Sequence, residues 1–300
     1  MECKMKEFVS KNRSYLMGIA MLFVVVFHAF CWIYNPVGGF NIGYVGVDMF
    51  LFLSGFGLAS SFEKNKLSIF YKNRLKRIYP MYSLAVLTTY LFLCQNDWGI
   101  DDLLYNLSSL GFYTKGGTQR YDWYLESLFT LYFLFPVFYH LSKLKYIALL
   151  FLFMLTVFVL YKYDVPWWYD CFIGRLPIFL YGIMFTQCYK SAKYIGALGV
   201  VLYIPCRLYV SQFLASSLLV IAIIFIVSYF IRHLNSSVNN VIIFIGKHSL
   251  EIYIVNQFIF WVMPIYTFTI VEGLMFYVLV QSIGAFLVIK INNEITKYLK

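Results

Sequence analysis

The chain alternates between long apolar runs and short polar or basic stretches. A helix that crosses the hydrocarbon core of a bilayer, about 30 Å thick, needs roughly 20 apolar residues. These runs are continuous rather than alternating with period two, which favours spanning helices over barrel strands. Ten runs qualify: about Ser14–Ile33, Tyr44–Phe62, Tyr79–Gln95, Asp122–Leu141, Tyr146–Lys162, Cys171–Tyr189, Tyr194–Arg207, Val210–Ile231, Val241–Met263 and Phe268–Ile289. The pattern predicts an all-α, polytopic membrane bundle of about ten transmembrane helices, with residues 1–300 forming a single domain.

The composition supports this prediction. Hydrophobic residues make up 61% of the 300 residues and charged residues 13%, whereas soluble domains carry roughly a quarter charged residues. Disorder is excluded because disordered chains are poor in aromatics, and this chain has 31 Phe and 27 Tyr. The six Cys and four His show neither paired Cys spacing nor an H-x-x-x-H pair, so no metal site is predicted.

The basic residues predict the orientation, because Lys and Arg favour cytoplasmic loops. With the amino terminus inside, 18 of the 24 basic residues lie in cytoplasmic segments and four lie outside. Both termini are therefore predicted to be cytoplasmic, with one larger external loop at about Asn96–Tyr121. The net charge of +10 reflects these loops and does not indicate nucleic-acid binding. We expect a multi-pass protein of the cytoplasmic (plasma) membrane.

Four ionisable residues lie inside the predicted spans, where such groups are costly and usually functional. They are His28, Asp48, Glu126 and Arg175, each about 6 to 7.5 Å from the outer end of its helix at 1.5 Å per residue. A neutral His can act as a general base, a carboxylate can orient it, and an Arg can stabilise an oxyanion. The alternatives are a structural network of His28, Asp48 and Arg175, and a Glu126 that reaches the headgroups.

A dense basic cluster precedes the third span and contains Lys72, Arg74, Lys76 and Arg77. The planar guanidinium of Arg suits phosphate oxygens, so this cluster is a candidate site for a phosphorylated substrate. The alternatives are a positive-inside loop without further function and a site for anionic lipid.

Six local patterns occur in an order that resembles the acyltransferase 3 family of ten-helix membrane acyltransferases. They are NRSYLMGIAMLFVVVFH (Asn12–His28), GYVGVDMFLFLSGFGL (Gly43–Leu58), FYKNRLKRIYPMY (Phe70–Tyr82), DWYLESLFTLYFLFP (Asp122–Pro136), GRLPIFLYGIMF (Gly174–Phe185) and IGKHSLEIYIVNQF (Ile245–Phe258).

This resemblance implies transfer of an acyl group, usually acetyl, from cytoplasmic acyl-coenzyme A to a hydroxyl of a cell-surface sugar. It implies that His28 is the catalytic residue and that Arg74 and Arg77 bind the acyl-CoA donor, while Asp48 and Arg175 match further family positions. Acetyl-CoA would be a donor substrate, with no permanently bound cofactor. The implied partners are a carbohydrate acceptor, the lipid bilayer and polysaccharide-assembly proteins.

Some positions differ from the family pattern. Met17 stands where many members have Arg, and Leu128 and Phe129 stand where many have Glu. Arg13 and Glu126, each about one turn away, are the candidates to replace them. No Cys or Ser stands beside His28 as a nucleophile, which favours direct transfer without an acyl-enzyme. The alternative functions are a transporter or flippase for a sugar or lipid-linked intermediate, and an inactive scaffold.

Overall fold

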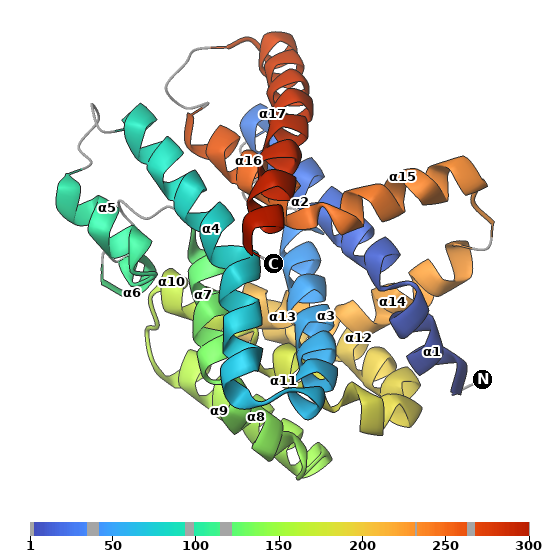
Figure 1. Cartoon of the computed structure of the whole chain (residues 1–300). Helices are drawn as coiled ribbons and strands as arrows, with labels where there is room; N and C mark the ends of the chain where they lie inside the picture. The colour runs from blue at the N-terminus through green and yellow to red at the C-terminus, as the bar shows by residue number, and fades with distance from the viewer. Residues whose placement is uncertain are drawn as a thin grey trace. The chain divides into compact units, whose positions relative to one another are not determined.

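The chain is helical throughout the part that the computed structural model describes, which comprises residues 3–34, 42–93, 99–114, 122–231, 233–262 and 268–299 (Figure 1). No strand occurs within these ranges, so the predicted all-α class is confirmed. The helices are α1 (Cys3–Lys11), α2 (Arg13–Tyr34), α3 (Ile42–Lys64), α4 (Leu67–Leu93), α5 (Ile100–Leu107), α6 (Gly111–Thr114), α7 (Trp123–Phe133), α8 (Phe135–Ser142), α9 (Tyr146–Lys162), α10 (Trp167–Ile173), α11 (Leu176–Cys188), the 3₁₀ turn η1 (Tyr189–Ser191), α12 (Ala192–Tyr209), α13 (Gln212–Leu218), α14 (Val220–Phe230), α15 (Ser236–Lys247), α16 (Ser249–Val262) and α17 (Ile270–Leu299).

Several helices are long and apolar enough to cross a membrane. Four described segments meet this criterion by length and composition, and two bent pairs raise the number to six if each pair counts as one span. The four segments are Ile42–Lys64, Trp167–Tyr209, Gln212–Phe230 and Ile270–Tyr298. These helices indicate a multi-pass membrane protein, while the number ten and the cytoplasmic termini stay predictions.

Some predicted spans consist of two helices. The run Asp122–Leu141 divides into α7 and α8 around Leu134, and the run Cys171–Tyr189 divides into α10 and α11 at Gly174 and Arg175. Pro136 and Pro177 stand in the first turns of α8 and α11. Proline has no backbone N–H and a fixed φ, so it starts a helix more readily than it continues one.

Other differences concern the ninth predicted span and the predicted external loop. The predicted span Val241–Met263 divides into α15 and α16, which are separated by His248. The described part of the predicted external loop, residues 99–114, is not irregular but forms α5 and α6.

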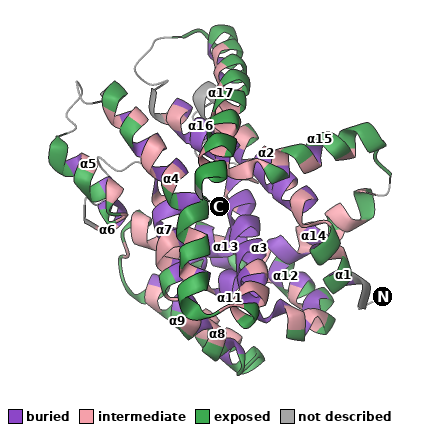
Figure 2. Cartoon of the chain, in the orientation of Figure 1, coloured by how far each residue is buried: buried purple, intermediate pink, exposed green. Residues whose placement is uncertain are grey.

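The chain divides into two compact units. Unit 1 contains residues 1–24, 41–65 and 133–247, and its centre is the pairing of α3 with α11. Figure 2 shows α3 buried along most of its length. A Cβ added to Gly55 of α3 would lie 2.6 Å from the Phe179 carbonyl oxygen of α11, so glycine allows these backbones to approach closely.

Unit 2 contains residues 25–40, 66–132 and 248–300, with α16 packed against α4 and α17. Asp122 precedes α7 and accepts hydrogen bonds from the backbone N–H groups of Tyr124 and Leu125, both at 3.0 Å, as an N-cap residue does. Its carboxylate also accepts a hydrogen bond from the Tyr253 hydroxyl of α16 at 2.7 Å. Asp122 therefore fixes α7 and α16, which carry Glu126 and Asn256, within one unit.

Candidate functional site

His28 lies on α2 in unit 2 and is half-buried. Its ring centroid is 5.5 Å from that of Phe27 and 5.1 Å from that of Phe260 on α16. Its Nδ1 atom forms a hydrogen bond with Oδ1 of Asn256, also on α16. Two aromatic rings and one polar contact thus fix the orientation of the imidazole.

The hydrogen bonds around Asn256 determine which way its amide points. The Tyr277 hydroxyl donates to the Val25 carbonyl oxygen at 3.1 Å and accepts from Nδ2 of Asn256. Gln281 donates through Nε2 to the Ile252 carbonyl oxygen at 3.0 Å, which turns its Oε1 toward the same Asn256 nitrogen, 3.5 Å away. Both neighbours therefore place the amide oxygen of Asn256 on the side of His28.

This direction assigns the tautomer of His28. Because Asn256 presents an oxygen, Nδ1 must carry the proton and donate it. In a neutral ring Nε2 then has the lone pair, which is the form that can accept a proton from a substrate. Asn256 and Tyr277 are functional candidates that sequence reasoning missed; the available signal was the polar Asn256 within the apolar run of the sixth motif.

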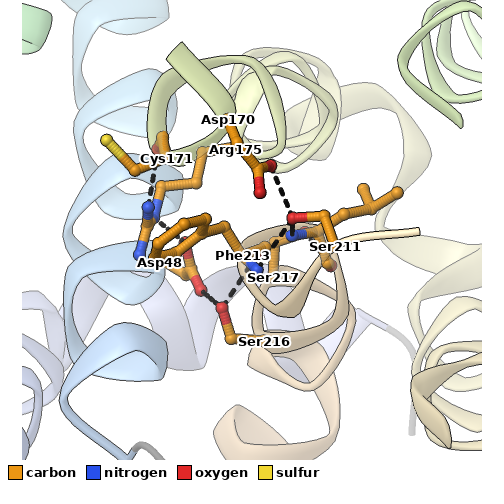
Figure 3. A network of polar contacts seen from close by, with 9 residues as sticks. Asp48, Asp170, Cys171, Arg175, Ser211, Phe213, Ser216 and Ser217 are labelled. Atoms are coloured by element: carbon orange, nitrogen blue, oxygen red, sulfur yellow. Dashed lines mark hydrogen bonds and ion pairs between the residues drawn. The ribbon is translucent and has the colours of Figure 1, made fainter. Parts of the chain in front are cut away.

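Asp48 and Arg175 form an ion pair in the core of unit 1, with 2.7 Å between Arg175 Nε and Asp48 Oδ1 (Figure 3). Both side chains are essentially inaccessible. The break between α10 and α11 makes Arg175 the N-cap residue of α11. Its Nη1 donates to the Cys171 carbonyl oxygen at 2.6 Å, and its guanidinium carbon lies 4.8 Å from the ring centroid of Phe213.

Serines of α13 and its N-cap extend this network, as Figure 3 shows. Ser216 donates to Oδ2 of Asp48 at 2.6 Å, so each carboxylate oxygen of Asp48 has a donor. Ser211 caps α13 by accepting from the N–H groups of Phe213 and Leu214, and it donates to Asp170 of α10 at 2.6 Å. The network joins α3, α10, α11 and α13.

Asp48 and Arg175 are therefore joined by an ion pair, and the donors on both carboxylate oxygens of Asp48 favour a structural role for these two residues. His28 belongs to unit 2 and has Asn256 as its polar partner. That Asp48 orients His28, and that all four ionisable groups share one layer, stay predictions.

Glu126 is fully buried in the first turn of α7, so the alternative that it reaches the headgroups is wrong. Its Oε1 accepts from the Tyr82 hydroxyl of α4 at 3.0 Å, and its Oε2 accepts from the Phe112 N–H of α6. Glu126 thus links the segment of α5 and α6 to α4 and α7.

The four basic residues of the cluster lie on α4, ahead of the predicted span that begins at Tyr79. At 100° per residue, Arg74 and Arg77 share one face of the helix and Lys72 and Lys76 share another. Arg74 is half-buried, whereas the other three are exposed. The two arginines therefore form a pair that is distinct from the two lysines.

The arginine pair carries positive charge that the described part of the chain does not neutralise. Neither Arg74 nor Arg77 forms an ion pair there, and Nε of Arg74 has no hydrogen-bond partner there. Burial is the main cause that lowers the pKa of the Arg74 guanidinium; Tyr132 opposes the shift and Arg77 adds to it. Two adjacent guanidiniums without a carboxylate suit an anionic ligand.

The positions that differ from the family pattern pack into the two units. In unit 1, Met17 is buried and the Arg13 guanidinium donates to the Leu53 carbonyl oxygen of α3 at 3.3 Å. In unit 2, Leu128 is buried and the Phe129 ring contacts Tyr82, with centroids 5.4 Å apart. At Met17, Leu128 and Phe129, where many family members have a charged residue, this chain has an apolar side chain that packs against its neighbours.

Comparison with known proteins identifies the relationship. No curated protein and no solved structure matches the chain. The sequence model of the acyltransferase 3 family, described as an acyltransferase domain, matches residues 14–289. This match includes His28, the α4 arginines and the Asp48–Arg175 pair, and it supports membrane acyltransferase activity. The chain belongs to the acyltransferase 3 family.

Proposed function

We propose that this protein transfers an acyl group, acetyl in the simplest case, from acyl-CoA to a hydroxyl of an extracytoplasmic cell-surface polysaccharide. His28 is the general base. One observation carries the proposal: the amide oxygen of Asn256 faces Nδ1 of His28, so that in a neutral ring the lone pair is on Nε2. The half-buried His28 is also the residue that matches the family's catalytic histidine.

The reaction needs one proton transfer and one acyl transfer. Nε2 of His28 takes the proton of the acceptor hydroxyl while the oxygen attacks the thioester carbonyl carbon. The C–O bond forms, the C–S bond breaks, and the proton passes to the departing CoA thiolate. The products are the sugar ester and free CoA, and no acyl-enzyme forms.

In this proposal Arg74 and Arg77 bind the phosphates of the donor. Their unneutralised charge and adjacent positions on α4 support this role. Lys72 and Lys76 lie on another face of α4, where they interact with the anionic membrane surface rather than with the donor. Asp48, Arg175 and Glu126 hold their helices in position and do not contact the reacting atoms.

Substitution of His28 tests the proposed function. His28→Ala should lower acyl-CoA-dependent esterification by about 100-fold or more, which is the usual contribution of a general base. The readouts are free CoA thiol released by the purified protein in nanodiscs and the mass of surface glycans from cells. His233→Ala is the matched control, because His233 is exposed.

The two readouts also separate the alternatives. A His28→Ala protein that melts at the wild-type temperature and still releases CoA thiol at the wild-type rate would overturn the role of His28. Wild-type protein that moves a lipid-linked sugar across the bilayer without consuming acetyl-CoA would indicate a transporter instead.

A further inference from the structure

A pocket lies within unit 1, away from His28 in sequence and not used by the proposed reaction. It has a volume of about 200 Å³, is partly open to the surroundings, and is formed by α9, α11, α12 and the adjoining ends of α13 and α14. This volume is below the range of sites for drug-sized molecules, roughly 300 to 1,000 Å³, so the pocket suits one narrow chain rather than a bulky ligand.

The lining of the pocket is almost entirely apolar. Leu149, Phe153, Ile178 and Leu202 are typical of it, and no charged side chain contributes. Neither a sugar nor the phosphates of CoA would find enough hydrogen-bonding groups there, because buried polar groups need partners. At the rim, Leu150 and Leu198 are 62% and 56% exposed, as suits a mouth that faces hydrocarbon. The lining therefore fits an alkyl chain.

One end of the pocket is polar and basic. The hydroxyl of Tyr146, the first residue of α9, donates to Ser191 of η1 at 2.8 Å. The adjacent residues Lys145 and Lys190, together with Lys193 at the start of α12, are exposed. All three lysines lie on the predicted cytoplasmic side. Basic groups beside a pocket between helices on that side match anionic lipid headgroups.

A buried hydroxyl lies between the apolar part and this basic end. Tyr181 of α11 lines the pocket and is only 1% exposed. Its hydroxyl has no hydrogen-bond partner within 3.5 Å among the residues that the structure describes, although Ser191 is near enough to interact with it. A buried hydroxyl normally has a partner, and the ester carbonyl at the top of a lipid chain would supply an acceptor.

We propose that this pocket binds an anionic phospholipid of the cytoplasmic leaflet, with one acyl chain between α9 and α12, an ester carbonyl at Tyr181 and the phosphate beside Lys145 and Lys193. The apolar lining corresponds to the acyl chain of this ligand, and the exposed lysines at one end correspond to its anionic headgroup. This site is independent of the proposed acyl transfer.

Photo-cross-linking tests the proposal with the full-length protein in phosphatidylcholine nanodiscs. The probe is phosphatidylglycerol with a photoactivatable acyl chain, and its adducts are mapped by mass spectrometry. We expect adducts on α9 and α12, and their loss in Leu202→Trp or Leu149→Trp, which fill the pocket. Val201→Trp and Ile147→Trp are the controls, because these residues of the same helices are 70% and 73% exposed.

The headgroup is tested separately. Lys145→Gln/Lys193→Gln should weaken competition by unlabelled phosphatidylglycerol about tenfold or more, given the typical contribution of each basic residue at a membrane surface. Lys64→Gln/Lys247→Gln, at exposed lysines elsewhere in unit 1, should leave it unchanged. Equal labelling by a phosphatidylcholine probe, adducts that persist in stably folded Leu202→Trp protein, or displacement by polyprenyl phosphate at lower concentration than phosphatidylglycerol would each overturn the proposal.

Discussion

At the scale of single residues, the central feature is a hydrogen-bond chain from His28 through Asn256 and Tyr277 to the Val25 carbonyl. The Val25 carbonyl can only accept a hydrogen bond. The Tyr277 hydroxyl must therefore donate to it and accept from Nδ2 of Asn256, which leaves the Asn256 oxygen for His28. A neutral amide thus bonds to Nδ1 of the imidazole and orients the ring. Such a chain orients the imidazole without a buried counter-charge, which is costly in a membrane.

The first prediction concerns Asn256. Asn256→Leu should lower kcat by about 10 to 100-fold with little change in the KM for acetyl-CoA, because it removes the acceptor for Nδ1 without touching the donor site. Asn256→Asp should restore most of the activity, since a carboxylate oxygen can accept the same proton. Steady-state kinetics in nanodiscs measures both. An Asp variant as inactive as the Leu variant would contradict the orienting role.

The second prediction concerns the Asp48–Arg175 pair. Arg175→Met should destabilise the protein by about 3 to 5 kcal/mol, because it leaves a buried carboxylate without its cation. Asp48→Leu combined with Arg175→Met should recover much of this loss, since an apolar pair has no unmet charge. Melting temperatures in detergent give the comparison. If the double variant melted below the single one, the pair would be more than a structural tie.

At the scale of elements, helix breaks decide where polar groups lie. Arg175 is placed in the core of unit 1 because α10 ends at Ile173 and α11 begins at Leu176. In a continuous helix, the 3.6-residue period alone would determine the direction in which Arg175 points. A break at His248 likewise separates α15 from α16, the helix that carries Asn256.

The third prediction uses the two faces of α4. Arg74→Gln and Arg77→Gln should each raise the KM for acetyl-CoA about tenfold, because each removes a charge-assisted hydrogen bond to phosphate. Lys72→Gln and Lys76→Gln are matched charge removals on the other face and should leave KM within about twofold. Equal effects at all four positions would indicate general surface charge instead of a donor site.

At the scale of the whole molecule, the chain forms two compact units, each with part of the predicted site. Unit 1 holds Asp48, Arg175 and the apolar pocket, and unit 2 holds His28, Asn256, Glu126 and the α4 arginines. Helix α2 contributes residues to both units. This division follows from how the helices pack and has no marker in the apolar pattern, which is continuous across both.

The fourth prediction concerns topology. With ten spans and both termini inside, a phosphatase reporter fused after Gly99 should be active, because the enzyme folds outside. A fluorescent-protein reporter fused after Lys66, Lys145 or Lys300 should be bright, because it folds inside. Phosphatase activity after Lys145 would show that the segment from α4 to α8 crosses the membrane differently from the prediction.

The sequence by itself determined the all-α class, the multi-pass character and the family. Each depends on local composition or on motif order, which folding does not change. It also indicated His28, Asp48, Glu126 and Arg175 as residues with a role, because ionisable groups inside a membrane are costly and usually functional.

Only the tertiary structure decided which side chain forms a hydrogen bond with His28, which helices Glu126 connects and which face of α4 carries unneutralised charge. Val25 lies on α2, more than 200 residues before Asn256 and Tyr277 on α16 and α17, and a hydrogen bond depends on distance and direction rather than on spacing along the chain. The apolar pocket likewise exists only between helices, because its residues read individually as ordinary lipid-facing side chains.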